Sequence, residues 1–268
     1  MEAITGIFDS HAHYDDPAFD PDRESLLASL AGAGVEAAMT IGADLATSQA
    51  AVALAERHPF LWAAVGVHPH GAARLPPDWL RQLEGLSAHP KVRAIGEIGY
   101  DYHYDGDWKE AQRAAFEAQL QLATRLEKPV VIHDREAHGD TMELLRKHRP
   151  GGVVHCFSGS AEMAKEILSL GMYLGFTGVV TFKNARRALE AAAVVPLDRL
   201  LVETDCPYMA PEPFRGKRCD STLLPYTIAK LAEVKGVTPQ ALVDAAAENA
   251  RRLFCGRGFC RRSTTPEV

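Results

Sequence analysis

Histidines and carboxylates recur along this sequence in short segments, and these residue types bind metal ions. The segments are DSHAH from Asp9, HPH from His68, GEIG from Gly96, HDR from His133, HCFSG from His155 and ETD from Glu203. A lone histidine is more often a hydrogen-bonded core residue than a ligand, but six such segments in one chain favour a shared site. Mixed imidazole and carboxylate donors suit Zn²⁺ or Mn²⁺, and Mg²⁺ less well.

These segments need a common frame, and the hydrophobic pattern predicts one. Eight short apolar runs are predicted as strands: Ile4–Phe8, Val35–Ile41, Leu61–Val67, Val92–Ile98, Pro129–Ile132, Val153–Val154, Met172–Phe176 and Leu200–Glu203. Amphipathic segments between them are predicted as helices: Asp22–Ala33, Leu45–Arg57, Asp78–Ala88, Lys109–Leu126, Asp140–Lys147, Ala161–Leu170 and Asn184–Val194. Two more helices, Thr222–Lys235 and Pro239–Phe254, follow the last strand, and Thr238 is expected to cap the second of them.

Apolar strands that alternate with helices indicate a parallel sheet covered on both faces. Eight such units favour an α/β fold of one domain over residues 1–268, a closed (β/α)8 TIM barrel with extra C-terminal helices. The tail after about residue 255 is expected to be irregular. In such a barrel the active site lies at the carboxyl ends of the strands, which is where the histidine and carboxylate segments are predicted to end up.

The spacing within this frame predicts two adjoining ion sites. His11 and His13 lie two apart on an extended segment, so their rings point the same way and can bind one ion. Asp205, on the last strand, lies beside the first strand in a closed barrel and can complete that site. A second ion can be held from adjacent strands by His133 and His155. Between the two sites stands Glu97, whose two carboxylate oxygens can bridge ions.

A family resemblance emerges from the motifs taken together and in order. DSHAH, GVHPH, GEIGYDY, VIHDR, HCFSG, VETDCP and FRGKR resemble the motifs of the TatD family of metal-dependent deoxyribonucleases, within the amidohydrolase-like barrels. The resemblance runs from the first strand to the closing ENARRLF, which is nearly the whole chain. It implies two divalent metal ions, one ligated by His11, His13, Glu97 and Asp205, the other by Glu97, His133 and His155.

The sequence departs from the family pattern near the substrate rather than at the ligands. Tyr100 stands where family members often have Leu, and Arg218-Cys219-Asp220-Ser221 replaces the Asn-Glu-Pro that usually follows Arg-Gly-Lys. Related hydrolases with a carboxylated lysine bridge have Lys at strand four, where this chain has Glu97, so the site needs no CO₂. These departures affect the expected substrate preference and leave the expected metal site intact.

Several cationic or polar side chains are candidates for substrate contacts. Arg135 lies two residues past His133, and the loop after the last strand carries Arg215, Lys217 and Arg218. A guanidinium group fits a phosphate oxygen pair well, although a solvated basic loop is the alternative interpretation. His68 is expected to face the mouth, where it could touch substrate or orient a ligand. Glu203 is expected to point into the barrel near the ligands, where it could orient one of them.

Three functions are consistent with these residues. The favoured one is a hydrolase of phosphodiester bonds, acting at the 3′ end of single-stranded DNA, with Glu97 and Asp205 as catalytic residues and Asp205 accepting the proton of the attacking water. The alternative is hydrolysis of a cyclic amide, ester or lactone, against which the cationic loop argues. A metal-binding scaffold without activity is disfavoured by a complete ligand set at an open mouth.

Composition limits the partners and the setting. The 268 residues are 47% hydrophobic and 24% charged, which is typical of a globular protein with a core. A net charge of -6 excludes non-specific condensation on nucleic acid or anionic lipid, so an anionic substrate needs local cations or metal. The longest uncharged runs, His58–Ala73 and Ile167–Phe182, are too short and too interrupted for a membrane span. Five scattered cysteines and an N-terminus without a basic region favour a cytoplasmic protein, with no membrane or obligate protein partner.

Overall fold

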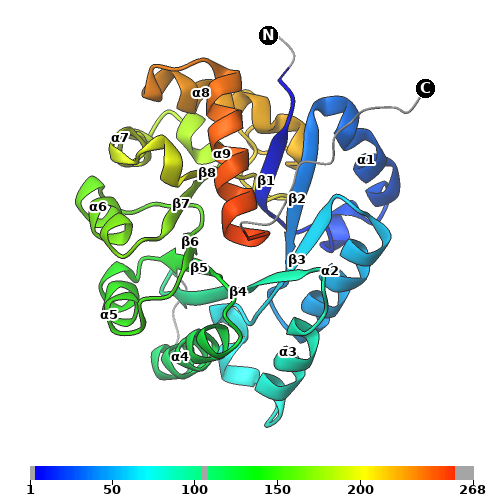
Figure 1. Cartoon of the computed structure of the whole chain (residues 1–268), viewed down its shortest axis with the longest axis vertical. Coiled ribbons are helices and arrows are strands. Elements are labelled where there is room, and N and C mark those ends of the chain that lie inside the picture. Colours follow the sequence, from blue (N-terminus) through cyan, green and yellow to red (C-terminus); the bar gives the residue numbers. More distant parts are fainter. Residues whose placement is uncertain (1–3, 104–107, 257–268) are drawn as a thin grey trace.

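The computed structural model describes residues 4–103 and 108–256. Its eight parallel strands follow one another around a single sheet in chain order: β1 Ile7–Ala12, β2 Val35–Ile41, β3 Leu61–Val65, β4 Val92–Asp101, β5 Val130–Arg135, β6 Gly152–Val154, β7 Tyr173–Phe176 and β8 Leu200–Val202 (Figure 1). The predicted irregular tail falls on residues 257–268, which lie outside the described residues.

The last strand returns to the first, which closes the barrel. The main-chain N–H of Asp205 donates to the carbonyl of His11 at 2.8 Å, and that of His13 donates to Cys206, also at 2.8 Å. Ala12 and Cys206 form a parallel bridge at the same place. The predicted (β/α)8 TIM barrel is therefore confirmed, and its closure lies beside two of the candidate metal ligands.

Nine helices of the described chain cover the sheet: α1 Arg23–Ser29, α2 Leu45–Arg57, α3 Trp79–Ser87, α4 Lys109–Arg125, α5 His138–His148, α6 Ala161–Ser169, α7 Arg186–Val194, α8 Leu224–Lys235 and α9 Pro239–Phe254. The Thr238 hydroxyl accepts a hydrogen bond from the N–H of Ala241, which confirms the predicted cap of α9. None of the helices in the described ranges is long and apolar enough to cross a membrane.

Several predicted boundaries differ from the observed ones by three residues or more. The first strand, predicted over Ile4–Phe8, runs over Ile7–Ala12, because barrel closure buries its polar residues as fully as its apolar ones. The first helix ends at Ser29 and tightens into a 3-10 turn that stops at the left-handed Gly34. Strand β4 continues three residues past its predicted end at Ile98.

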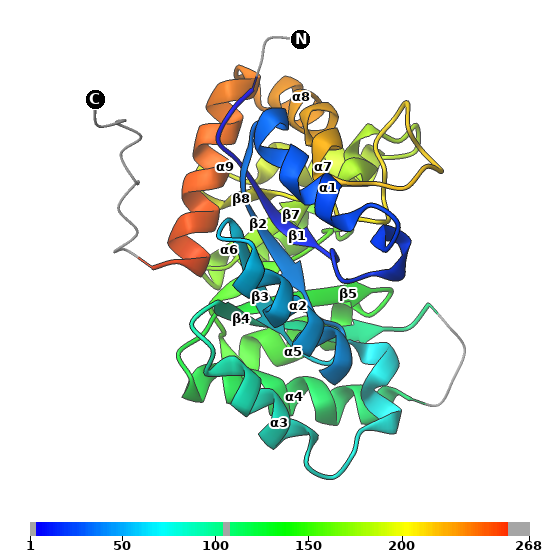
Figure 2. The same cartoon turned by 90° about the vertical axis from the view of Figure 1, so that its right-hand side faces the viewer.

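A separate apolar cluster fills the barrel interior, and residues of α9 complete it at one end of the barrel. All eight strands contribute residues to this cluster, among them Phe8 and Tyr173, and α9 contributes Ala247, Ala250 and Phe254. The rings of Phe8 and Phe254 stack with centroids 6.3 Å apart. In Figure 2, α9 lies at one side of the barrel and the loops that follow β1 and β8 lie at the other. Helix α9 therefore closes the end opposite the carboxyl ends of the strands.

Candidate metal centre

The six predicted ligands converge at the carboxyl ends of the strands. His11, Glu97 and His133 lie within β1, β4 and β5. His13 and His155 directly follow β1 and β6, and Asp205 lies three residues after the end of β8. Most of them are nearly inaccessible, with His11 0%, Glu97 3% and His155 4% exposed. Such polar side chains remain buried only where they find partners, and these side chains have one another.

The first donor group consists of His11, His13 and Asp205, with one oxygen of Glu97. The two histidine Nε2 atoms are 3.1 Å apart, as the spacing of two residues on an extended segment predicts. Asp205 Oδ1 lies 3.6 Å from His11 Nε2 and 3.4 Å from His13 Nε2. Glu97 Oε2 lies 3.5 and 3.7 Å from the same two nitrogens. Four ligand atoms on three strands therefore surround one point.

The second donor group forms around the other oxygen of Glu97. Glu97 Oε1 lies 2.8 Å from His133 Nδ1 and 2.7 Å from His155 Nε2. Those two ring nitrogens are 3.2 Å apart. The carboxylate of Glu97 therefore presents one oxygen to each group, which is the arrangement of a bridging ligand.

These separations fit metal coordination. Ligand atoms bound to one ion at about 2.0–2.2 Å lie about 3.0–3.6 Å from one another in an octahedral or tetrahedral shell. The spacings of the first group fall in this range or just beside it, and two of the three spacings in the second group are slightly shorter. The described residues thus supply His, Asp and Glu groups that can hold metal ions.

Hydrogen bonds to the far nitrogens set the orientation of two of the rings. His13 Nδ1 donates to the carbonyl of Ile41 at 2.8 Å, which leaves its Nε2 for the first group. Asp101 Oδ2 lies 3.0 Å from His133 Nε2. His155 Nδ1 has no hydrogen-bond partner among the described residues, and the carboxylate of Glu203 is 3.8 Å away. The predicted proximity of Glu203 to the ligands is thus observed, at a distance longer than a hydrogen bond.

A buried carboxylate outside the two groups fastens their elements together. Asp9 accepts hydrogen bonds from the Thr204 main chain at 3.0 Å, the Thr204 hydroxyl at 2.7 Å and the Ser221 hydroxyl at 2.6 Å. Burial raises the pKa of Asp9 to about 6, against these hydrogen bonds, which lower it. Through Asp9, the segment that carries Asp205 is tied to the strand that carries His11.

Electrostatics favour protons on three of the rings, His133, His13 and His155, when no metal is bound. Burial lowers the pKa of His133, but hydrogen bonds to Asp101 and Glu97 outweigh burial and raise it to about 10. The pKa of His13 is likewise lowered by burial yet raised overall to about 9 by Asp205 and Glu97. A metal ion must displace these protons. Metal affinity therefore falls as the pH is lowered.

The two carboxylates remain ionised despite their burial. Burial raises the pKa of Glu97, but the charge of His155 and hydrogen bonds from His11 and His133 hold that pKa well below its usual range. The pKa of Asp205 is also lowered overall, because a hydrogen bond from His13 and the nearby imidazoles outweigh its burial. Both groups are thus available as anionic ligands at neutral pH.

His68 lies beside the second donor group and carries its ring proton on Nε2. Its Nδ1 accepts the main-chain N–H of His70 at 3.2 Å, so the proton of the neutral ring lies on Nε2. Burial lowers the pKa of His68 to about 3, which keeps the ring neutral. Nε2 lies 3.7 Å from Glu97 Oε1 and presents an N–H beside the second group. This position agrees with the expectation that His68 faces the mouth.

The predicted substrate contacts occupy different surroundings. Arg135 ends β5 and is half-buried. Arg215 and Lys217 are exposed on the loop after β8, and the Arg215 guanidinium lies 4.4 Å from the ring centroid of Phe182.

Arg218 has a partner in the structure. Its two terminal nitrogens bond the two carboxylate oxygens of Asp22 at 2.6 and 2.7 Å, and its guanidinium lies over the ring of Phe19. This bidentate pair ties the loop to the segment before α1. Arg215 and Lys217 are therefore the stronger candidates for phosphate contacts.

Two residues at the mouth were missed from the sequence. Asp101 contacts His133, and Tyr208, three residues after Asp205, exposes 55% of its surface. The signal for Asp101 was present, because Glu97, Gly99 and Asp101 alternate along one strand and share a face. No pattern marks Tyr208, whose exposure depends on the conformation of the loop.

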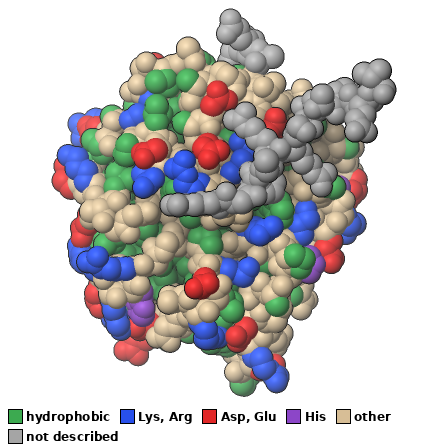
Figure 3. Space-filling view, viewed as in Figure 1, with side chains coloured by type: hydrophobic (Ala, Val, Ile, Leu, Met, Phe, Trp, Pro, Cys, Tyr) green, Lys and Arg blue, Asp and Glu red, His purple; other side chains and the backbone are tan. Residues whose placement is uncertain are grey.

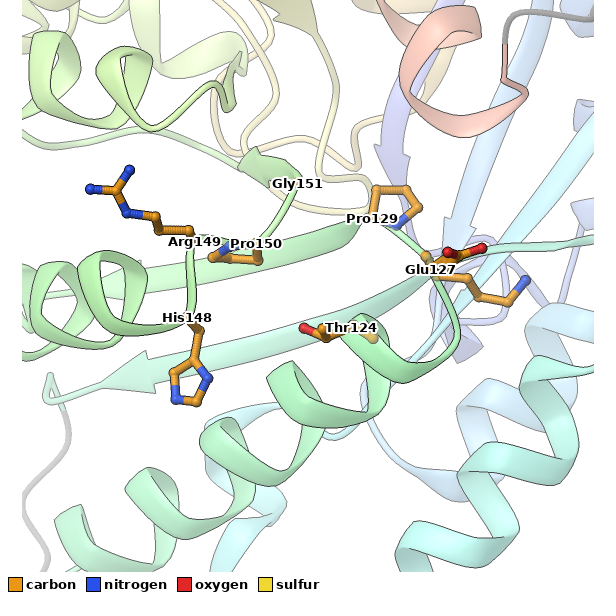
Figure 4. A pocket seen from close by; sticks show the side chains of 9 residues that line it. Thr124, Glu127, Pro129, His148, Arg149, Pro150 and Gly151 are labelled. Carbon is orange, nitrogen blue, oxygen red and sulfur yellow. The ribbon is translucent and has the colours of Figure 1, made fainter.

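A pocket also lies away from the metal centre. It has a volume of about 270 Å³ between the C-terminal ends of α4 and α5 and the starts of β5 and β6 (Figure 4). Its lining includes Thr124, Glu127, His148 and Arg149, and none of the predicted site residues. The pocket lies at the amino ends of β5 and β6, whereas the candidate metal centre lies at the carboxyl ends of the strands.

Fold and site together define a class. A (β/α)8 barrel with histidine and carboxylate donors at the carboxyl ends of its strands is the architecture of a metal-dependent hydrolase. The sequence model of the family described as TatD related DNase matches residues 8–255. The chain belongs to this family.

Relatives agree with this assignment. An uncharacterized metal-dependent hydrolase, YabD, from Bacillus subtilis is 40% identical over 251 residues, which cover 92% of this chain and 98% of that protein. The 3'-5' ssDNA/RNA exonuclease TatD of Citrobacter rodentium is 36% identical, over 92% of this chain and 97% of that protein. Among solved structures, YJJV, a TatD homologue from Escherichia coli K12, superposes with a TM-score of 0.88 at 33% identity, covering 93% of this chain and 98% of that one.

Proposed function

We propose that this chain uses two divalent metal ions to hydrolyse phosphodiester bonds at the 3′ end of single-stranded DNA. The observation that carries the proposal is the carboxylate of Glu97, whose Oε1 and Oε2 each face a separate donor group. A bridge of this kind typically holds two ions about 3.5–4 Å apart. The exonuclease name of the Citrobacter rodentium relative supports a nucleic-acid substrate. Zn²⁺ and Mn²⁺ suit the donors best.

The chain's own residues have distinct tasks in this reaction. When bound, the ions stabilise negative charge on the phosphoryl oxygens and make water more acidic. Asp205 is ionised and its side chain is 13% exposed, so it can accept a proton from the attacking water. His68 offers its Nε2–H to a phosphate oxygen from the other side of Glu97.

Substrate binding is proposed for the rim of the mouth. Arg215 and Lys217, with Arg135 at the end of β5, can contact phosphates, and the exposed ring of Tyr208 offers a surface on which a terminal base can stack. Tyr208 is held in place, because its N–H donates to the Asp205 carbonyl at 2.9 Å and its hydroxyl to Asp16 at 3.2 Å.

The face opposite the mouth carries charges of both signs on its described residues. Over the α9 face, the visible described residues show Lys and Arg mixed with Asp and Glu (Figure 3). Such a mixture does not make a track for a long polyanion. A strand end at the mouth needs only a few local cations.

We place the enzyme in the cytoplasm on the basis of its cysteines, of which the four described ones are free.

A substrate panel tests the proposed function. Purified protein with Zn²⁺, Mn²⁺ or Mg²⁺ is incubated with single-stranded DNA labelled at the 5′ or the 3′ end, and with a dihydropyrimidine and a lactone. We expect the 3′ label to be released first and the 5′-labelled strand to shorten stepwise. Turnover of the cyclic amide or the lactone without cleavage of DNA would establish the alternative hydrolase function instead.

The double substitution Arg215→Ala and Lys217→Ala should weaken DNA binding without loss of metal. We expect a raised KM. The slope of the logarithm of the binding constant against the logarithm of the salt concentration should become shallower by about 0.7 for each phosphate that the loop no longer neutralises. The matched control is Arg146→Ala with Lys147→Ala, which removes the same charge from the last turn of α5. An unchanged salt slope in the loop variant would show that other residues bind the phosphates.

A further inference from the structure

The ring of His133 is held between two carboxylates of the same strand. Its Nδ1 lies 2.8 Å from Glu97 Oε1, and its Nε2 lies 3.0 Å from Asp101 Oδ2. Of these two carboxylates, only Glu97 belongs to the donor groups described above. Asp101 lies on the outer side of the ring, and its side chain is 1% exposed. A buried carboxylate in this position sets which ring nitrogen carries the proton.

The length of β4 brings Asp101 to this position. Strand β4 extends four residues beyond Glu97, and its register pairs Gly99 with His133 and Asp101 with Arg135. Gly99 has a φ of 146°, and a Cβ there would lie 1.9 Å from the carbonyl oxygen of His133. A side chain at this position would therefore push β4 away from β5, so Gly99 permits the close approach.

A buried glutamine of α4 holds the main chain of Asp101. Gln112 Oε1 accepts the N–H of Asp101 at 3.0 Å, and Gln112 Nε2 donates to its carbonyl at 2.9 Å. Seven residues further along α4, Gln119 binds the N–H and carbonyl of Val67 at 2.7 and 3.1 Å in the same manner. Helix α4 therefore fixes the main chain at two points of the mouth, one beside His68 and one at Asp101.

The remaining contacts of the Asp101 carboxylate suit an ionised acceptor. Oδ1 accepts the N–H of His103 at 3.0 Å, and Oδ2 lies 3.2 Å from His70 Nε2 as well as facing His133. Each oxygen thus has nitrogen partners, and the carboxylate is held in one orientation. A carboxylate fixed in this way accepts the His133 Nε2–H and leaves Nδ1 for the second donor group.

We propose that Asp101 is a positioning residue for the metal centre: it fixes the proton of His133 on Nε2 and so directs Nδ1 to the metal beside Glu97, with Gln112 holding Asp101 in place. This inference rests on the proposed metal-ligand role of His133. Residues that hold ligand histidines in this way typically contribute about 10–100-fold to metal affinity.

Zinc affinity of the full chain tests the proposal. Competition with a chromophoric chelator measures both Zn²⁺ affinities in Asp101→Ala and in the nearly isosteric Asp101→Asn, which keeps an acceptor without the charge. We expect Asp101→Ala to weaken one Zn²⁺ site by about 10–100-fold and Asp101→Asn to weaken it less. In the zinc-loaded protein, the His133 Nε2–H resonance should exchange slowly in the wild type and be absent in Asp101→Ala.

Asp134→Ala is the matched control. Asp134 is the residue after His133 on β5, and its Oδ2 lies 2.7 Å from Nδ1 of another histidine, His138. It should leave both Zn²⁺ affinities unchanged. His133→Ala separates the two hypotheses. If His133→Ala weakens zinc binding and neither Asp101 variant does, the positioning role is wrong while the metal centre stands. If His133→Ala leaves zinc binding unchanged, both assignments are wrong.

Discussion

The substitution Asp205→Asn is expected to lower kcat by about 10²–10⁴-fold in a protein that remains folded, which is the usual effect of removing a general base. The asparagine carbonyl can still face the first donor group, but its amide cannot accept a proton at neutral pH. The main chain should tolerate the change, because Asp205 has a φ of 59° and asparagine adopts this left-handed conformation readily. The measurement is kcat on a defined oligonucleotide at saturating metal, with thermal unfolding alongside.

The competing explanation of Asp205 is a purely structural role in the turn that follows it. In the structure the turn is closed by the main-chain carbonyl of Asp205, which accepts the N–H of Tyr208 at 2.9 Å. Asparagine preserves this bond, so a structural role predicts an almost silent substitution. A kcat within about tenfold of the wild type, equivalent to about 1.4 kcal/mol, would decide for the structural role.

Removal of the Glu97 side chain should cost both metal ions at once. Each oxygen of this carboxylate faces a different donor group, so Glu97→Ala leaves three ligands in the first group and two in the second. Loss of the ions removes several kcal/mol of transition-state stabilisation, or about 10³-fold or more in rate. Metal content per chain, measured after dialysis against a fixed low metal concentration, should fall together with activity.

Glu117→Ala is a suitable control for this experiment, since Glu117 pairs with Lys147 and His148 on the outer helices. It removes a carboxylate that already has cationic partners, and it should leave metal content unchanged. Two ions per chain and wild-type activity in Glu97→Ala would show that the carboxylate does not bridge.

Hydrophobic periodicity was sufficient to predict the barrel and to place its site at one end. The strand Val35–Ile41 is mostly apolar, and its predicted bounds match the observed ones. The bounds predicted for β1 are wrong because Asp9 and His11 are as buried as Phe8, and a hydrophobicity pattern treats such residues as a loop. The burial of these polar residues follows from barrel closure, which is a property of the whole sheet.

The outer contacts of the site depend on pairs that are far apart in the sequence. Arg218 binds Asp22 across 196 residues, and Asn249 donates to the carbonyl of Leu197 to fasten α9. Spacing along the chain carries no signal for such partners. By contrast, His11 and His13 lie together as predicted, because their proximity follows from the two-residue repeat of an extended chain.

The packing of Phe254 against Phe8 has a consequence for how the enzyme turns over. The apolar cluster around these two rings closes the barrel at the end opposite the mouth. A nucleic-acid end bound at the mouth therefore has no exit on the far side. Under the proposed function, a released nucleotide must therefore leave through the same opening that the shortened strand occupies. The shortened nucleic-acid strand has to move back before the product can leave. After each cleavage the strand then either binds again in the site or dissociates. If the proposed exonuclease function is correct, this geometry favours removal of a few nucleotides at a time over long processive degradation.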